Sequence, residues 1–172
     1  MAGRGASTDA SFEGYSALAG SVAAVTTNQI VVISNLFSTR VKFMKYQSER
    51  VLIIDDDSSL RIMLKLILQQ AGHVVVGEAK DGAEGLRLIG MCKPTLILLD
   101  LDMPCVEGLS VLSRTHRDYP DMAVLVVSAL CSTTYAQRCM RLGARGFLGK
   151  EDCVVLLGKA IERLQNGQIL FP

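Results

Sequence analysis

Residues 51–57 read Val-Leu-Ile-Ile-Asp-Asp-Asp, an apolar run of strand length that ends in three acidic residues. Residues 95–102 repeat this design, because Thr-Leu-Ile-Leu-Leu is followed there by Asp-Leu-Asp. Strands that are apolar throughout, rather than at alternate positions, are typical of a parallel sheet that is covered on both faces. The two stretches therefore predict an α/β fold with acidic residues at the carboxyl ends of its strands.

After residue 50 the chain alternates apolar strands with segments of helical periodicity. Further strands are expected at residues 74–76, 123–127 and 146–148, and helices at residues 60–68, 83–89, around 109–112, up to 142 and at 152–164. This alternation is typical of a parallel sheet with helices on both faces. We therefore expect a doubly wound α/β fold with five parallel strands.

The composition favours one domain with an extension and gives no sign of a nucleic-acid surface. Of the 172 residues 49% are hydrophobic, and 18 basic residues against 17 acidic ones leave a net charge of +1. A near-neutral chain lacks the basic surface that attracts nucleic acid or anionic membranes, and a chain without Trp lacks much of a base-stacking surface. We expect no direct nucleic-acid binding and no membrane binding by this chain.

Residues 1–48 differ from the rest because they are rich in Ala, Ser, Gly and Thr, and we expect a poorly ordered N-terminal extension there. Residues 14–39 carry no charge, but Thr-Thr-Asn-Gln at 26–29 interrupts the apolar stretch, so we expect neither a membrane span nor a signal peptide. Five cysteines without a C-x-x-C pair argue against a structural zinc site. They indicate reduced thiols and a cytoplasmic location.

Acidic side chains follow the first and the third strand, which are neighbours in a flavodoxin-like sheet. Asp55 and Asp56 end the first strand, and Asp100 and Asp102 follow the third. Carboxylates that converge in one crevice repel one another, which raises their pKa values unless a cation offsets their charge. An oxygen-rich site of this kind suits Mg²⁺.

Two further polar residues end strands at the same edge of the sheet, Ser128 after the fourth and Lys150 after the fifth. A hydroxyl and a fixed ammonium beside a metal-bound carboxylate form a cradle for phosphoryl oxygens. Each residue also has a simpler interpretation when it is taken alone. Asp57 ahead of Ser58 and Ser59 suits a helix N-cap, a serine suits a turn, and a lysine suits solvent.

Residues 49–166 resemble a response-regulator receiver domain of two-component systems. The resemblance is carried by motifs in the family's order and spacing: Val-Leu-Ile-Ile-Asp-Asp at 51–56, Leu-Leu-Asp-Leu-Asp-Met-Pro at 98–104 followed by Gly108, Val-Val-Ser-Ala at 126–129, and Gly-Phe-Leu-Gly-Lys at 146–150. It implies the CheY-like, flavodoxin-like form of the doubly wound fold, with strand order 2-1-3-4-5.

The resemblance also implies roles for the acidic residues. Asp100 is the expected phosphoacceptor, which takes a phosphoryl group from the phosphohistidine of a sensor histidine kinase. Asp55 and Asp56 are expected to hold Mg²⁺ together with Asp100, and Asp102 to offer its main-chain carbonyl to the ion.

The remaining motif residues have expected roles around the phosphoryl group. Ser128 is expected to hydrogen-bond one phosphoryl oxygen beside the small Ala129, and Lys150 to pair with another. Phe147 matches the switch aromatic of the family, with a plain core aromatic as the alternative. Phosphorylation would then switch a partner-binding surface, and the expected partners are the sensor kinase and a second copy of the chain.

Glu151 follows Lys150 where many receivers have proline, which resembles the subclass that carries a LuxR-type helix-turn-helix output. Residues 167–172 resemble the start of the linker to that output. We expect no helix after residue 166 and therefore no helix-turn-helix in this sequence. We therefore expect a stand-alone receiver, a truncation product or an excised domain.

Two other functions are weighed against this one. Asp100-Leu101-Asp102 superficially resembles the nucleophile motif of haloacid-dehalogenase-type phosphatases, but that family has the motif on its first strand, and Met103-Pro104 follows here. A degenerate receiver that serves only as an interaction module would not need the site residues, whereas each site position here holds a competent residue type. We expect a signalling receiver rather than an enzyme.

Overall fold

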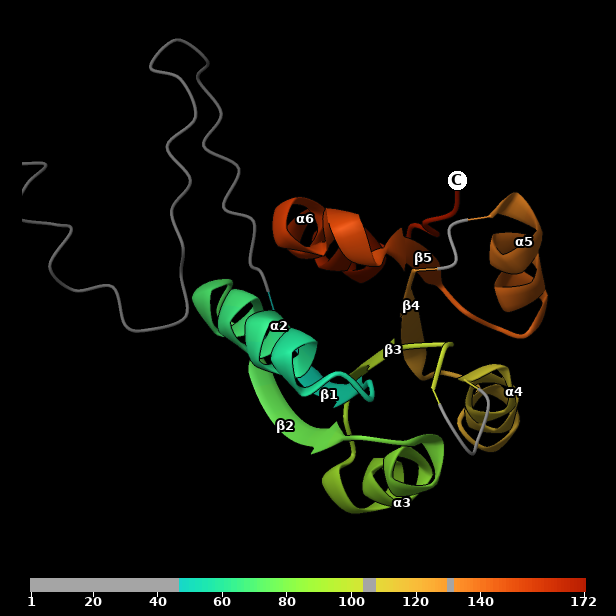
Figure 1. The fold of residues 1–172 in the computed structure, drawn as a ribbon, viewed down its shortest axis with the longest axis horizontal. Coiled ribbons are helices and arrows are strands. Elements are labelled where there is room, and N and C mark those ends of the chain that lie inside the picture. The colour runs from blue at the N-terminus through green and yellow to red at the C-terminus, as the bar shows by residue number, and fades with distance from the viewer. Residues whose placement is uncertain (1–46, 104–107, 130–131) are drawn as a thin grey trace, which may run out of the picture. The chain divides into compact units, whose positions relative to one another are not determined.

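A computed structural model describes residues 47–103, 108–129 and 132–172. Five parallel strands form one sheet in the order β2-β1-β3-β4-β5, which confirms the predicted topology (Figure 1). The strands are β1 (Arg50–Ile54), β2 (Val74–Ala79), β3 (Leu96–Leu99), β4 (Ala123–Ser128) and β5 (Gly146–Gly149).

Helices cover both faces of the sheet, as the alternating pattern predicted (Figure 1). They are α2 (Ser58–Gln70), α3 (Gly82–Cys92), α4 (Gly108–Asp118), α5 (Thr133–Arg141) and α6 (Cys153–Gln165), with a 3-10 turn η2 (Lys150–Asp152) ahead of α6. Helices α2 and α6 pack on one face of the sheet, and α3, α4 and α5 pack on the other.

The side chains of β1 explain why its sequence is apolar at each of the four positions after Arg50. Leu52 and Ile54 belong to the core under α3, α4 and α5, whereas Val51 and Ile53 belong to the core under α2 and α6. Successive residues of a strand point to opposite faces, so a strand in the middle of a covered sheet buries all of them. Each of these four side chains is 0% exposed, and burial of each is worth roughly 1.5–3 kcal/mol.

The described unit begins at Gln47, two residues before the predicted start of the domain. The side-chain amide of Gln165 donates to the Gln47 carbonyl over 2.5 Å, and the Ser48 hydroxyl donates to the Gly72 carbonyl over 2.7 Å. The rest of the expected N-terminal extension, with residues 14–39, lies outside the described residues. In the described parts of the chain, no helix has the length and apolar character to cross a membrane.

Residues 167–172, expected to begin a linker, contact the outer edge of β5 through Leu170. Leu170 forms a parallel bridge with Gly146. Its N–H donates to the Arg145 carbonyl over 3.0 Å, and its carbonyl accepts from the Phe147 N–H over 2.7 Å. Glycine at position 146 permits this approach, because a Cβ there would lie 2.8 Å from Leu125 Cδ1 and 3.1 Å from Leu170 Cβ.

Candidate functional site

Asp55 and Asp100 lie next to each other at the carboxyl edge of the sheet. Their strands are neighbours, with Ile54 opposite Leu99, and the Asp100 N–H donates to the Ile54 carbonyl over 2.9 Å. The two aspartates are 2% and 1% exposed. The structure thus brings together two buried carboxylates that are 45 residues apart in the sequence.

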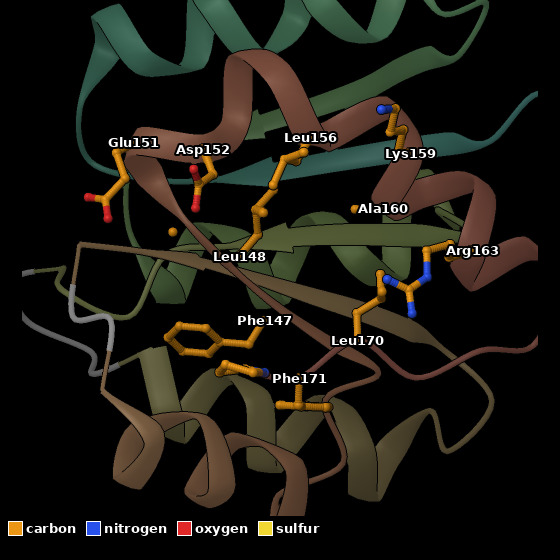
Figure 2. Close-up of a pocket in the computed structure, with 12 residues that line it drawn as sticks. Phe147, Leu148, Glu151, Asp152, Leu156, Lys159, Ala160, Arg163, Leu170 and Phe171 are labelled. Atoms are coloured by element: carbon orange, nitrogen blue, oxygen red, sulfur yellow. The ribbon is translucent and has the colours of Figure 1, made fainter.

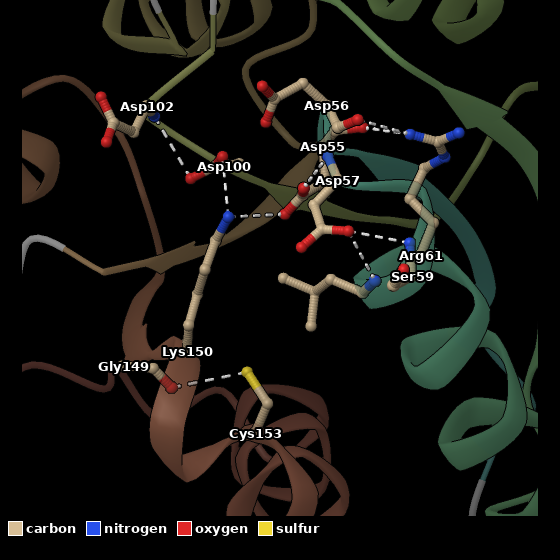
Figure 3. A network of polar contacts seen from close by, with 11 residues as sticks. Asp55, Asp56, Asp57, Ser59, Arg61, Asp100, Asp102, Gly149, Lys150 and Cys153 are labelled. Carbon is tan, nitrogen blue, oxygen red and sulfur yellow. Dashed lines mark hydrogen bonds and ion pairs between the residues drawn. The ribbon is translucent and has the colours of Figure 1, made fainter.

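Lys150 lies between these two carboxylates (Figure 3). Its Nζ is 2.9 Å from Asp100 Oδ2 and 3.0 Å from Asp55 Oδ2. Lys150 follows directly after β5, and its side chain is 22% exposed. An ammonium in this position offsets part of the negative charge of two carboxylates that water reaches poorly. The simpler interpretation of Lys150 as a solvated lysine is therefore wrong.

Asp56 adds a third carboxylate to the pair. Carboxylate oxygens of Asp55, Asp56 and Asp100 all lie within 4.8 Å of one another. Mg²⁺ prefers oxygen ligands in octahedral geometry, in which two ligand atoms on opposite sides of the ion are about 4 Å apart. Three carboxylates and one ammonium leave two negative charges uncompensated when all are ionised, which matches a divalent cation. The donor set, its spacing and its charge fit Mg²⁺.

Burial and hydrogen bonding shift the pKa values of this group in opposite directions. Burial raises the pKa of Asp55 above its ordinary value, although hydrogen bonds from Lys150 and from the Asp57 N–H oppose that rise. Burial by itself lowers the pKa of Lys150, but hydrogen bonds to Asp100 and Asp55 outweigh it, so the pKa is raised. Lys150 is therefore held in its charged form by the carboxylates that it bridges.

Asp57 and Asp102 have contacts of a different kind. Asp57 is the N-cap of α2, since its Oδ1 accepts from the main-chain N–H groups of Ser59 and Leu60 over 2.8 and 3.2 Å. The N-cap interpretation is thus correct for Asp57. The carboxylate of Asp102 is exposed, and its main-chain N–H donates to Asp100 Oδ1 over 3.2 Å.

Ser128 is the last residue of β4 and is 0% exposed. It pairs with Gly149, the residue directly before Lys150, so both polar residues stand at the same edge of the sheet. Ala129 follows as an exposed residue. Ser128 is therefore a buried strand residue, not the exposed turn residue of the simpler interpretation.

Phe147 is 8% exposed and packs in the core under α3, α4 and α5. It also lines a cavity of about 440 Å³ between β5, α6 and the C-terminal segment, together with Leu156 and Phe171 (Figure 2). Lys159 and Arg163 of α6 line the same cavity. The aromatic ring therefore belongs to the core and at the same time adjoins open space.

Two residues around the acidic cluster were not singled out as site residues from the sequence. Arg61 donates from Nη1 to the main-chain carbonyls of Asp55 and Asp56, over 2.7 and 3.3 Å. Gly108 packs so closely behind Asp100 that a Cβ would lie 2.3 Å from the Asp100 carbonyl oxygen. The position of Gly108 four residues after Pro104 could have indicated its role in the sequence. No sequence pattern indicates which main-chain carbonyls an arginine side chain contacts.

The sequence pattern of the family described as "Response regulator receiver domain" matches residues 51–162. The transcription regulator BvgA of Bordetella pertussis is 32% identical over 123 residues, which are 72% of this chain and 59% of BvgA. The chemotaxis protein CheY of Thermotoga maritima is 32% identical over 102 residues, or 59% of this chain and 85% of CheY.

Among solved structures, the receiver domain of the response regulator NarL from Mycobacterium tuberculosis is 34% identical, with a TM-score of 0.65. The match covers 72% of this chain and 100% of that domain. The chain spans about three fifths (59%) of the length of the first curated relatives it matches. The family match and the receiver fold with its acidic edge together show that the chain belongs to the response regulator receiver domains of two-component systems.

Proposed function

We propose that Asp100 accepts a phosphoryl group from the phosphohistidine of a sensor histidine kinase, and that this phosphorylation is the signal that the domain transmits. The observation that carries the proposal is the contact of 2.9 Å between Lys150 Nζ and Asp100 Oδ2. A buried carboxylate at a strand end, beside a fixed cation, is suited to act as a nucleophile towards a highly charged group.

In the proposed reaction, a carboxylate oxygen of Asp100 forms a bond to phosphorus while the phosphorus–nitrogen bond of the phosphohistidine breaks. The electron pair of the broken bond stays with the imidazole nitrogen of the kinase, which becomes protonated. The product is an acyl phosphate, a mixed anhydride of Asp100 and phosphoric acid. Lys150 stays beside the phosphoryl oxygens and offsets their charge.

The acidic cluster is the proposed Mg²⁺ site. Asp55, Asp56 and Asp100 would hold the ion with their carboxylates, and Asp102 with its main-chain carbonyl. When bound, Mg²⁺ supplies positive charge that offsets the charge of the transferring phosphoryl group. The support for this assignment is the all-oxygen donor set within 4.8 Å and the excess negative charge around Lys150.

The proposed output is a rearrangement near β5. The Ser128 hydroxyl donates to a phosphoryl oxygen, and Phe147 repacks as the end of β4 moves. The open space beside Phe147 supports this part of the proposal, because an aromatic ring in a filled core has no alternative place to occupy. The altered surface binds partners, which we propose to be the kinase and a second copy of the chain.

The proposed setting is a cytoplasmic phosphorelay in which the domain acts as a signalling module and catalyses no reaction of a separate substrate. BvgA, one of the relatives, is described as a positive transcription regulator, so control of transcription is the proposed output of the system. The near-neutral charge supports the view that this chain does not itself bind DNA.

Intact mass spectrometry after treatment with acetyl phosphate and Mg²⁺ tests the proposal. We expect one added phosphoryl group, which is lost in Asp100→Asn and in the presence of EDTA. Asp121→Asn is the matched control, because Asp121 is an exposed residue that precedes β4 at the opposite edge of the sheet, and this variant should keep the adduct. A wild-type protein that binds Mg²⁺ but is phosphorylated by neither acetyl phosphate nor any histidine kinase would instead support the degenerate interaction module.

A further inference from the structure

Arg61 lies at the start of α2, and its side chain reaches back to the loop that carries the acidic cluster. Its Nη1 donates to the Asp55 carbonyl over 2.7 Å and to the Asp56 carbonyl over 3.3 Å. Figure 3 shows the guanidinium beside this loop, on the side away from Lys150. The side chain is only 18% exposed, so solvent competes weakly for these hydrogen bonds.

Glu78 lies beside the guanidinium and beside a second basic side chain of α2. Glu78 of β2 has Oε2 3.9 Å from Arg61 Nε and Oε1 2.7 Å from Lys65 Nζ. Arg61 and Lys65 are four residues apart, so they project from the same face of α2. Glu78 therefore holds two cations from one helix face, and it offsets the charge of Arg61, which would otherwise oppose the binding of a metal cation nearby.

The hydrogen bonds of Arg61 act on the peptide plane that orients the Asp55 carboxylate. The Asp56 carbonyl and the Asp57 N–H belong to one planar peptide group. That N–H donates to Asp55 Oδ1 over 2.8 Å. When Arg61 holds the carbonyl of this plane, it also fixes the direction of the N–H and hence the position of the Asp55 carboxylate.

Asp56 depends on the same main-chain geometry. Its side chain is exposed, so tertiary packing does little to fix its direction, and its Cα–Cβ bond follows the loop. The carboxylates of Asp55 and Asp56 therefore keep their mutual position through the main chain between them. Arg61 contacts both carbonyls of this stretch.

We propose that Arg61 is a positioning residue that holds the loop of residues 55–57 in its metal-binding geometry and thereby raises the affinity of the cluster for Mg²⁺. The inference deepens the proposed function and rests on it. Lysine is a poor replacement for Arg61, because Nη1 contacts the two carbonyls while Nε, at another position of the planar guanidinium, faces Glu78, and a lysine has only one nitrogen for both tasks.

Two kinds of measurement on the full chain test this role: the Mg²⁺ affinity by calorimetry, and the NMR signal of the Asp57 amide in metal-free protein. Arg61→Ala should weaken Mg²⁺ binding by roughly tenfold, the lower end of what loss of an outer-shell partner costs. It should also shift the Asp57 amide and speed its hydrogen exchange. Arg61→Lys should show most of both effects, and it serves the same test if Arg61→Ala does not fold.

Lys65→Ala is the matched control. Lys65 contacts Glu78 as Arg61 does, and more closely, at 2.7 Å against 3.9 Å, but it lies one helical turn further from the loop. Lys65→Ala should leave both the Mg²⁺ affinity and the Asp57 amide close to wild type. Equal effects of the two alanine substitutions, or an Arg61→Ala protein with wild-type values, would overturn the proposal. If wild-type protein binds no Mg²⁺, the proposed metal site fails, and the Asp57 amide still decides whether Arg61 positions the loop.

Discussion

Gly108 lies directly behind the main chain of Asp100: a Cβ at position 108 would be 2.3 Å from the Asp100 carbonyl oxygen and 2.5 Å from Leu101 Cα. Both neighbours are main-chain atoms, so neither can rotate away as a side chain can. The start of α4 and the end of β3 therefore approach as closely as they do only because residue 108 has no side chain.

Gly108→Ala should disturb the site through this contact. We expect a loss of about 1–3 kcal/mol in the free energy of unfolding, as for other overpacked positions, and slower phosphorylation of Asp100. Urea unfolding and intact mass after acetyl phosphate measure the two effects. Gly158→Ala on α6 is the matched control, because a Cβ at residue 158 would have no neighbour within 4 Å. It should be neutral or stabilising by up to about 1 kcal/mol.

Lys150→Met should slow phosphorylation far more than it weakens Mg²⁺ binding. The substitution keeps much of the side-chain volume but removes the ammonium that lies 2.9 Å from Asp100 Oδ2. Loss of one preorganised donor to a developing charge costs roughly 10²–10³-fold in rate. Time courses with acetyl phosphate measure this loss, and calorimetry measures Mg²⁺ binding. Lys159→Met, at an exposed position on α6, should react like wild type. Equal rates for the two variants would show that Lys150 does not act on the phosphoryl group.

His73 should make the stability of the domain depend on pH. It is 8% exposed, and its Nδ1 accepts from the Glu49 N–H over 3.2 Å. Burial lowers the pKa of His73 below its ordinary value of 6.5, although the nearby Glu49 carboxylate partly opposes the shift. A protonated Nδ1 could no longer accept the hydrogen bond.

The sign of this dependence follows from the lowered pKa. Between the folded-state pKa and 6.5, the unfolded chain binds more protons than the folded one. The contribution of His73 is therefore fully present above pH 6.5 and is lost as the pH falls towards the folded-state pKa. Urea unfolding of wild type and His73→Gln over this range should give a steeper decline for wild type. Parallel curves for the two proteins would contradict the prediction.

Leu170→Ala should loosen the C-terminal segment from β5. Leu170 is partly buried against the core under α2 and α6. We expect a loss of about 1–2 kcal/mol in unfolding free energy, less than for a fully buried leucine, and faster hydrogen exchange of the Phe147 amide, which donates to the Leu170 carbonyl. The neighbouring Ile169 is 64% exposed, so Ile169→Ala should change the stability by less than about 0.5 kcal/mol. A slow Phe147 amide in Leu170→Ala would show that the side chain does not hold the segment.

The fold and the acidic cluster were predictable because both depend on simple periodic features. A strand such as β1, with four successive apolar residues from Val51 to Ile54, is expected inside a covered sheet. Carboxylates after β1 and β3 must then share an edge, which is where Asp55 and Asp100 meet. The order of the strands and the roles of the residues needed the resemblance to a known family, because periodicity does not specify which strands are neighbours.

Arg61 and the C-terminal segment show what the sequence could not indicate. The function of Arg61 depends on the direction of two main-chain carbonyls, which no side-chain pattern records. The resemblance to the LuxR-type subclass predicted the start of a linker at residues 167–172, but Leu170 and Phe171 pack on opposite sides of the sheet. The apolar stretch of residues 169–171 is too short to show a periodicity, so the sequence did not indicate that it contacts β5.

The bridge between Leu170 and Gly146 also bears on how the domain behaves in concentrated solution. The edge strand of a sheet presents unpaired N–H and carbonyl groups, which can template aggregation by pairing with a strand of another molecule. Here Leu170 occupies the carbonyl of Arg145, directly before β5, and the N–H of Phe147 on β5. Removal of Leu170 and the residues after it would therefore expose unpaired main-chain groups at the edge of β5. A fragment that ends at residue 166, the predicted end of the domain, should precipitate more readily than the full chain.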